Sequence, residues 1–294
     1  MNTERLRGCG IGLRREHYAE VLAERPPAAW FEVISENFMV DGGRPRHVLE
    51  QVRKHYPVAL HGVSLSLGST EPLNPIHLGK LRELVSWVEP ELVSDHLCWT
   101  GLGGHNSHDL LPLPFTEEAV RVAAGNIRQV QDALRRRILI ENVSSYLRVS
   151  ESEMTEWEFL SAAAEAADCH ILLDVNNIYV NARNHGFDPA HYLAGVPAHR
   201  VAQFHLAGHE DHGHVVIDTH DHPVCDAVWN LYGQALIRFG DVPTLIEWDA
   251  SVPDLPRLLS EAGASHRRRV CRDSNPPRSW GEDAGGPPPG RTGE

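Results

Sequence analysis

Short apolar runs rich in valine, isoleucine and leucine recur along the chain, and amphipathic stretches separate most of them. The runs that are typical of strands span residues 8–14, 30–37, 58–65, 91–99, 137–144, 170–177, 200–208 and 244–249. Stretches with helical spacing of apolar residues span 15–24, 45–56, 74–88, 115–137, 151–167 and 224–239. This alternation predicts a parallel α/β sheet, and eight repeats favour a closed (β/α)₈ TIM barrel over an open doubly wound sheet.

The apolar pattern stops near Gly263, where proline, glycine and charged residues take over. Such a composition cannot bury enough apolar surface to offset the entropy of ordering the chain. We therefore expect a TIM-barrel catalytic domain over residues 1–263 and a disordered tail over 264–294. A chain that ends near Ala264 should then keep its melting temperature.

The composition of the chain limits which binding partners and which cellular compartment we expect. The 294 residues include 40 acidic and 27 basic ones, which gives a net charge of −13 and disfavours binding to nucleic acid. No run approaches the roughly 20 apolar residues that cross a bilayer, and the first residues do not resemble a signal peptide. The five cysteines form no C-x-x-C pair, which argues against disulfides and thiolate zinc sites. We expect a cytoplasmic protein that is not bound to a membrane.

Polar residues interrupt the apolar strand candidates near their carboxyl ends, where TIM barrels build their active sites. They are His61, His96, Glu141, Asp174, His205 and Glu247. A polar side chain directed into a barrel mouth loses hydration, and that loss must be offset by pairing or by a metal. Three carboxylates at one point repel one another unless cations lie between them. The pattern therefore predicts a metal site with these six residues as its catalytic core.

The loops after two strands offer further ligands. Asn177 follows Asp174 by three residues, and Asp218 and His220 flank Thr219 in a segment that would direct both side chains the same way if it is extended. We expect three metal positions: the first held by His61, His96 and Glu141; the second by Glu141 as a bridge with Asp174, His205 and Glu247; and the third by Asn177, Asp218 and His220.

Several motifs carry a family resemblance between residues 10 and 249. They are GIGLR, ISEN, LHGVSLSLG, SDHL, ILIENVS, LLDVNNIYVNARNHG, FHLAGH, DTH and IEWD. With these motifs the chain resembles the multinuclear non-heme iron-dependent oxidative enzymes, which include the oxidases of methanobactin biosynthesis and have xylose isomerase-like barrels.

The resemblance implies an oxidase or oxygenase that modifies a ribosomally made peptide during natural product biosynthesis, typically at cysteine. It implies a centre of two or three iron ions in mixed Fe(II) and Fe(III) states, with O₂ as co-substrate. It also implies a small companion protein that presents the precursor peptide.

Other functions use similar ligands. A trinuclear zinc endonuclease of abasic DNA resembles this chain in ligand order but usually has histidine where Asn177 stands, and an amide oxygen is a weaker zinc ligand. A zinc or manganese hydrolase or isomerase is therefore the alternative to the iron enzyme. A metal-binding scaffold without turnover is the third interpretation.

Overall fold

Eight parallel strands form a closed barrel in the part of the chain that the structure, a computed structural model, describes: residues 6–103 and 105–274. The strands are β1 (Cys9–Gly12), β2 (Phe31–Ile34), β3 (Val58–Gly62), β4 (Leu92–His96), β7 (Leu139–Glu141), β8 (His170–Asp174), β9 (Val201–Leu206) and β12 (Thr244–Ile246). Each pairs in parallel with its neighbours in this order, and β12 closes the ring against β1. The predicted TIM barrel is confirmed.

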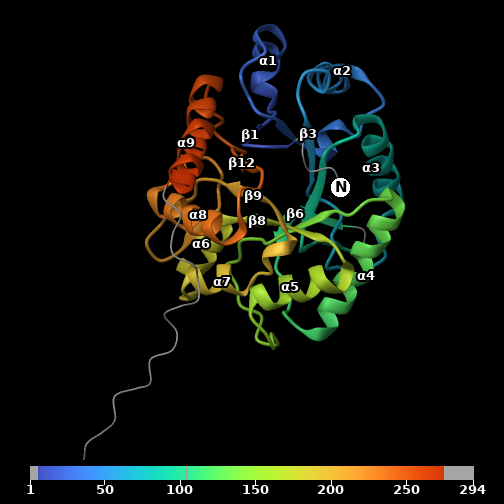
Figure 1. Cartoon of the computed structure of the whole chain (residues 1–294). Helices are drawn as coiled ribbons and strands as arrows, with labels where there is room; N and C mark the ends of the chain where they lie inside the picture. The colour runs from blue at the N-terminus through green and yellow to red at the C-terminus, as the bar shows by residue number, and fades with distance from the viewer. Residues whose placement is uncertain (1–5, 104, 275–294) are drawn as a thin grey trace, which may run out of the picture.

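Helices surround the barrel (Figure 1). They are α1 (Tyr18–Glu24), α2 (Gly43–Val52), α3 (Pro75–Val88), α4 (Glu117–Leu134), α5 (Glu156–Ala167), α6 (Val175–His185), α7 (Pro189–Gly195), α8 (Asp226–Phe239) and α9 (Leu255–Ser274), with 3₁₀ turns at Arg15–His17, Ser35–Phe38 and Ala198–Arg200. None of the described helices is both long and apolar enough to span a membrane.

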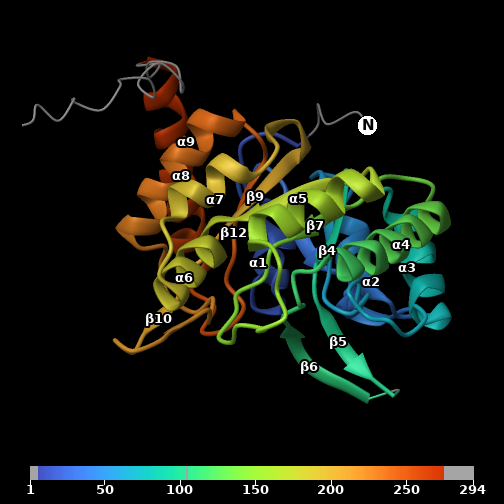
Figure 2. The same cartoon turned by 90° about the horizontal axis from the view of Figure 1, so that it is seen from below.

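Every predicted strand range contains a barrel strand, but sequence analysis missed some elements. Helices α6, α7 and α9 were not predicted, nor were two small antiparallel sheets, β5 (Trp99–Leu102) with β6 (His105–Leu111) and β10 (Glu210–Asp211) with β11 (Val216–Ile217). These hairpins and the loop after β7 extend from the same end of the barrel (Figure 2). That end carries the carboxyl termini of the strands.

Side chains inside the barrel form layers, because alternate residues of a strand point to the same face. A floor cluster consists of Leu6, Trp30, Ala59, Leu92, Leu139, Leu172 and Leu245, each at most 2% exposed. Two positions further along β3, β7 and β8, the inward residues are His61, Glu141 and Asp174. The intervening residues, such as Leu60 and Ile140, join the separate core between strands and helices. Strand alternation thus places the polar residues above an apolar floor.

Trp30 fills the floor beside β1, and this packing requires a glycine there. A Cβ atom at Gly10 would lie 2.3 Å from the Trp30 ring. Any larger residue at position 10 would therefore displace the tryptophan from the floor cluster.

The predicted start of the tail at residue 264 is wrong. Helix α9 continues to Ser274, and within it Ser265 is fully buried and Arg269 is 6% exposed. The Arg269 guanidinium donates to the Tyr232 hydroxyl at 3.0 Å and to the Val242 carbonyl at 2.6 Å, and it also contacts Asp241 and Thr244. The arginine-rich segment has a polar composition, but this arginine satisfies buried polar groups at the start of β12. Residues 275–294 lie outside the described residues, so a disordered tail there stays a prediction.

Truncation tests this correction. A chain that ends at Ala264 loses the bonds from Ser265 and Arg269 to the Tyr232 hydroxyl and from Arg269 to Thr244 and the Val242 carbonyl, at about 0.5–1.5 kcal/mol for each bond, although Tyr232 and Thr244 still bond to each other at 3.0 Å. We expect its melting temperature to fall by roughly 5–15 °C relative to a chain that ends at Ser274, measured by calorimetry. Equal melting temperatures for the two truncations would show that residues 265–274 do not stabilise the barrel.

Candidate metal centre

A cavity of about 180 Å³ opens at the carboxyl ends of the strands. Its lining residues are Ile34, His61, Val63, His96, Leu110, Glu141, Ser144, Asn177, Asp218, Thr219, His220, Glu247 and Asp249. Asp174 and His205 do not line this cavity, but each offers a ligand atom within 4.8 Å of one on Glu141, which does. The structure therefore brings all nine sequence-predicted site residues together.

Barrel strands position six of the nine. His61, His96, Glu141, Asp174 and His205 lie at or within one residue of the ends of β3, β4, β7, β8 and β9, and Glu247 directly follows β12. All six are at most 7% exposed. The parallel pairing places His96 beside Glu141 and Asp174 beside His205, so these side chains converge near the carboxyl ends of the strands.

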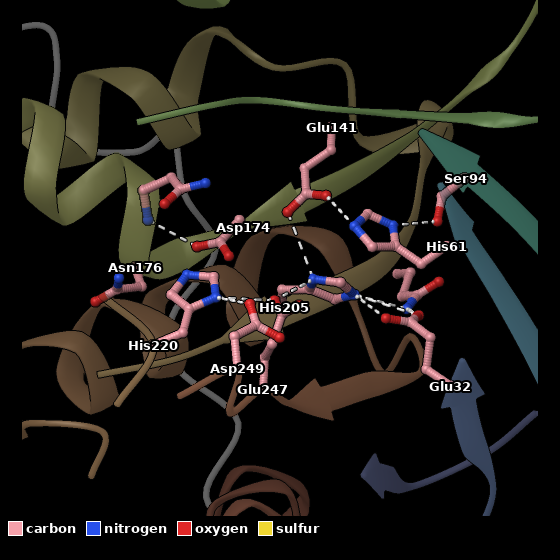
Figure 3. Close-up of polar contacts among 12 residues, drawn as sticks. Glu32, His61, Ser94, Glu141, Asp174, Asn176, His205, His220, Glu247 and Asp249 are labelled. Atoms are coloured by element: carbon pink, nitrogen blue, oxygen red, sulfur yellow. Dashed lines mark hydrogen bonds and ion pairs between the residues drawn. The ribbon is translucent and has the colours of Figure 1, made fainter. Parts of the chain in front are cut away.

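Glu141 is the hub of the cluster. Its Oε2 atom lies 3.4 Å from His61 Nε2 and 3.3 Å from His96 Nε2. Its Oε1 atom lies 3.4 Å from His205 Nδ1. Figure 3 shows the Glu141 carboxylate contacting His61 on one side and His205 on the other. This geometry suits a carboxylate that bridges two cations.

Glu247 links the hub to the histidine that follows β11. Its Oε2 atom lies 3.0 Å from His205 Nδ1 and 3.5 Å from His220 Nδ1. On its other side, His220 Nε2 lies 2.7 Å from Asp218 Oδ1. The cluster therefore continues from the barrel axis to the loop residues.

Four groups of three residues could each hold a cation, because their ligand atoms lie within 4.8 Å of one another. They are His61 with His96 and Glu141; His61 with His205 and Glu247; Glu141 with Asp174 and His205; and Asp174 with His220 and Glu247. The first group equals the first metal position expected from sequence. The last differs from the expected third position, because Asp174 and Glu247 also reach His220.

Each histidine is oriented by a partner on its outward nitrogen. His96 Nδ1 lies 3.0 Å from the Gly62 carbonyl, His220 Nδ1 lies 3.1 Å from Asp249, and His205 Nε2 lies 3.1 Å from Glu32. These oxygens only accept, so the outward nitrogen carries a proton, and with a metal bound the inward nitrogen would present its lone pair.

The fourth histidine follows the same pattern. His61 Nδ1 lies 2.8 Å from the Ser94 hydroxyl, which itself donates to the Leu60 carbonyl (Figure 3). Metal-ligating histidines usually donate their second N–H in this manner. The arrangement fits a metal centre better than a set of buried ion pairs.

Buried polar atoms without a hydrogen bond gather in the same place. Among the described residues they include Glu141 Oε2, Asp174 Oδ2, Asn177 Oδ1, His205 Nδ1 and His220 Nε2. Unsatisfied buried atoms are rare in folded proteins because each costs the lost interaction with water. Five of the nine candidate ligands carry one, and metal coordination would satisfy all five.

The charges in the cluster also demand a cation. Burial, together with Glu141 and Asp218, raises the pKa of Asp174 well above its ordinary value. Burial lowers the pKa of His205, but Glu32, Glu247 and Glu141 outweigh it and raise that pKa well above its ordinary value. Without metal, protons are drawn into the cluster to balance the carboxylates.

Two local predictions need correction. The strand predicted over 170–177 ends at Asp174. The Asp174 carboxylate accepts a hydrogen bond from the backbone N–H of Asn177 at 2.7 Å and so caps the start of α6. Asn177 therefore lies in the first helical turn rather than in a loop. Asp218 and His220 do face each other, but not through strand alternation, because His220 has a φ of 49°.

Four positioning residues escaped sequence analysis. Glu32 holds His205, and Asp249 holds His220 while pairing with Arg14 at 2.5 Å. Asn176 donates to Asp218 at 2.7 Å. Glu32 interrupts an apolar strand just as His61 does, and Arg14 and Asp249 stand in the GIGLR and IEWD motifs. These signals were present, but Glu32 lies in mid-strand, away from the strand ends.

Comparisons with known proteins agree with this architecture. A UPF0276 protein from Anaeromyxobacter sp. (strain Fw109-5) is 58% identical over 260 residues, covering 88% of this chain and 92% of the relative. Endonuclease IV from Thermus thermophilus has a TM-score of 0.57 at 15% identity, covering 91% and 99% of the two chains. A D-tagatose 3-epimerase-like protein has a TM-score of 0.61 at 13% identity, covering 91% and 98%. These two likenesses show the fold alone.

The family comparison covers nearly the whole described chain. The sequence model of the RiPP precursor modification enzyme MbnB/TglH/ChrH, where RiPP denotes a ribosomally made and modified peptide, matches residues 8–269. The match includes every strand of the barrel and all nine residues around the cavity. The chain therefore belongs to the MbnB/TglH/ChrH family of RiPP precursor modification enzymes.

Proposed function

We propose that this protein uses iron and O₂ to oxidise a ribosomally made precursor peptide, with cysteine as the modified residue. Family membership supports a precursor peptide as the substrate. The donor set supports iron, and the cavity above it supports access of a substrate side chain.

The observation that carries the proposal is the set of inward-facing donors. His61, His96 and Glu141 form a group of two histidines and one carboxylate, the set that non-heme iron(II) oxygenases use. The nine donors are nitrogen or oxygen atoms of histidine, carboxylate and amide groups. Zinc and manganese accept the same atom types, so the identity of the metal needs a direct measurement.

We assign three cation positions on these contacts. His61, His96 and Glu141 would hold the first ion, and Glu141 would share the second with Asp174, His205 and Glu247. Asn177, Asp218 and His220 would hold the third, with Asp174 and Glu247 close enough to His220 to contribute. The orphaned Asn177 Oδ1 atom fits this role.

Bound iron would supply a binding site for thiolate and one-electron chemistry with O₂. The chain itself supplies the surroundings. Ile34, Val63 and Leu110 give the cavity apolar walls that exclude water from the substrate side chain, and Ser144 and Thr219 add hydroxyl groups. Among the described residues, no cysteine lines the cavity, since Cys9, Cys98 and Cys169 are buried elsewhere and the partly exposed Cys225 precedes α8, so a reacting thiol would arrive with the peptide.

A small companion protein that presents the peptide is part of the proposal. It rests on the resemblance to iron-dependent oxidative enzymes alone. Turnover assays should therefore be run with and without such a partner.

Metal content and O₂ use test the function together. Protein purified without oxygen should contain two or three iron ions per chain and should consume O₂ when it oxidises a cysteine-containing precursor peptide. His61→Ala should lose iron and lower product formation more than about 100-fold, because losing a ligand should cost more than losing an outer partner. Mass spectrometry of the peptide and elemental analysis are the measurements.

His55→Ala is the matched control, since His55 is exposed in the turn after α2. It should retain iron and activity. Protein that holds zinc and cleaves or isomerises its substrate without O₂ would replace the proposal with the hydrolase or isomerase alternative. Bound iron without any turnover of precursor would favour the scaffold.

Glu32 provides a second test, through the orientation of His205. The Glu32 carboxylate accepts from His205 Nε2 and from Gln203 Nε2, the latter at 2.6 Å, so His205 Nδ1 faces Glu141. In Glu32→Gln, the new amide can donate to His205 Nε2 and move the ring proton to Nδ1. We expect metal affinity to fall about 10- to 100-fold, measured by titration with Fe(II) under argon. Unchanged affinity, equal to that of the exposed control Glu50→Gln, would show that Glu32 does not orient a ligand.

Asn177 provides a third test. An uncharged amide oxygen is a weaker ligand than imidazole, so the ion beside it should be lost first on chelation. Asn177→His should raise the zinc content per chain and lower O₂-dependent turnover, while its ring N–H can still donate to the Asn142 carbonyl as Asn177 does at 3.0 Å. Asn230→His adds a histidine at an exposed position of α8 as the control. If Asn177→His bound no more zinc than that control, Asn177 would not be a ligand.

A further inference from the structure

A second hollow of about 460 Å³ lies beside the metal cavity, and we call it the side pocket. Its walls come from the segment after β6, the loop between β7 and α5, the first turn of α5, and the residues at and just after the end of α6. The apolar side chains include Leu113, Phe115, Leu147, Met154, Trp157 and Phe187. Leu147, one of these wall residues, is 72% exposed, so part of the wall faces solvent.

The side pocket and the metal cavity share a dividing wall. Ser144 lines the metal cavity and Ser145 lines the side pocket, while Leu110 lines the cavity and Leu113 the pocket. Three residues of extended chain span about 10 Å at most. A bound peptide in extended form can therefore place one residue at the metal cavity and a side chain about three positions away in the side pocket.

The dividing wall is held firmly. The fully buried Asn181 accepts from the Ser145 amide at 2.7 Å and donates to the Val143 carbonyl at 2.9 Å. The Tyr146 hydroxyl accepts from the Asp218 amide at 3.1 Å. The wall thus connects the side pocket to a candidate metal ligand.

Glu156 supplies the carboxylate of the side pocket, which also contains the Arg148 guanidinium. Its carboxylate accepts from Asn181 at 2.9 Å and from the Tyr192 hydroxyl at 2.9 Å. Among the described residues, no lysine, arginine or histidine nitrogen forms an ion pair with the Glu156 carboxylate within 4.0 Å. Arg148 and His185 also line the pocket, but the Arg148 guanidinium donates to the His185 carbonyl and the His185 ring bonds to Ser145.

A carboxylate in such surroundings gains from a cation. Burial raises the pKa of Glu156 to about 7, although the hydrogen bonds from Tyr192 and Asn181 lower it. A ligand ammonium or guanidinium group would restore part of the lost hydration, and its methylene stem would cover apolar wall. The net charge of −13 on the chain adds attraction for a basic peptide.

We infer that the side pocket binds a lysine or arginine side chain of the substrate peptide, about three residues from the residue that enters the metal cavity. The stem packs against Trp157 and Phe187, and the cation reaches Glu156. The identity of the occupant as part of the substrate rests on the proposed function. The preference for a cation rests on the pocket alone.

Two probes of equal length test this preference. N-acetyl-lysine N-methylamide carries the ammonium group, and N-acetyl-norleucine N-methylamide keeps the four-carbon chain without it. Binding to the full chain as purified is measured by NMR at about pH 8, where Glu156 is ionised. We expect the lysine probe to bind about tenfold more tightly, because one hydrogen bond to a charged group contributes this much.

Three variants locate the effect. Glu156→Gln should abolish the difference between the two probes, and Trp157→Ala should weaken both. Glu153→Gln, which removes an exposed charge three residues away, should leave the difference unchanged. Norleucine binding as tightly as lysine to the unchanged protein would overturn the inference, as would a lysine preference that persists in Glu156→Gln.

These measurements use neither O₂ nor turnover. If peptide oxidation fails but the lysine preference holds, the side pocket stands and the proposed function falls. If oxidation holds and the preference is absent, only the side pocket assignment is wrong.

Discussion

The crowding of carboxylates at the mouth of the barrel is the constraint on which the rest of the site depends. Glu141, Asp174 and Glu247 come from separate strands and cannot all remain charged in a buried cluster unless cations lie between them. The apolar floor below offers no solvation, and the surrounding histidines carry only one proton each unless the cluster draws in more. The barrel therefore creates a local deficit of positive charge, which Arg14, 3.8 Å from Glu247, and protons taken up by His205 and His220 offset when no metal is bound.

The hydrogen-bond partners of the four histidines orient the rings toward this cluster and so define the geometry in which a cation would bind. Carbonyl, hydroxyl and carboxylate oxygens hold the outward nitrogens of the histidines, so their inward lone pairs point at the same small volume. An ion pair network would instead direct protons toward the carboxylates. The strands that form the barrel also position these partners. Ser94 lies on β4 two residues before His96, and Glu32 lies on β2. Fold stability and ligand orientation are thus not separable here.

Sequence alone predicted the barrel and gathered the nine candidate ligands, because period-two alternation and strand ends leave a strong signal in His61, Glu141 and Asp174. It failed where tertiary contacts decide. Asp174 caps a helix that the sequence around it does not predict. Arg269 lies in a segment with the composition of a disordered tail, and only its contact with the residues before β12 shows that it is ordered. Glu32 faces the barrel axis from mid-strand, and its role depends on a residue 173 positions away. The side pocket combines three distant segments, so no local pattern marks it.

The floor cluster limits access to the site from the lower end of the barrel. Trp30, Leu92, Leu139, Leu172 and Leu245 close the lower end of the barrel at 2% exposure or less, and Gly10 lets the tryptophan ring seat fully. In the described part of the chain, ions, water and any reactant must therefore pass through the same upper opening. On the proposed function, metal ions and the substrate side chain would share this opening, and a side chain in the cavity would cover ions bound beneath it.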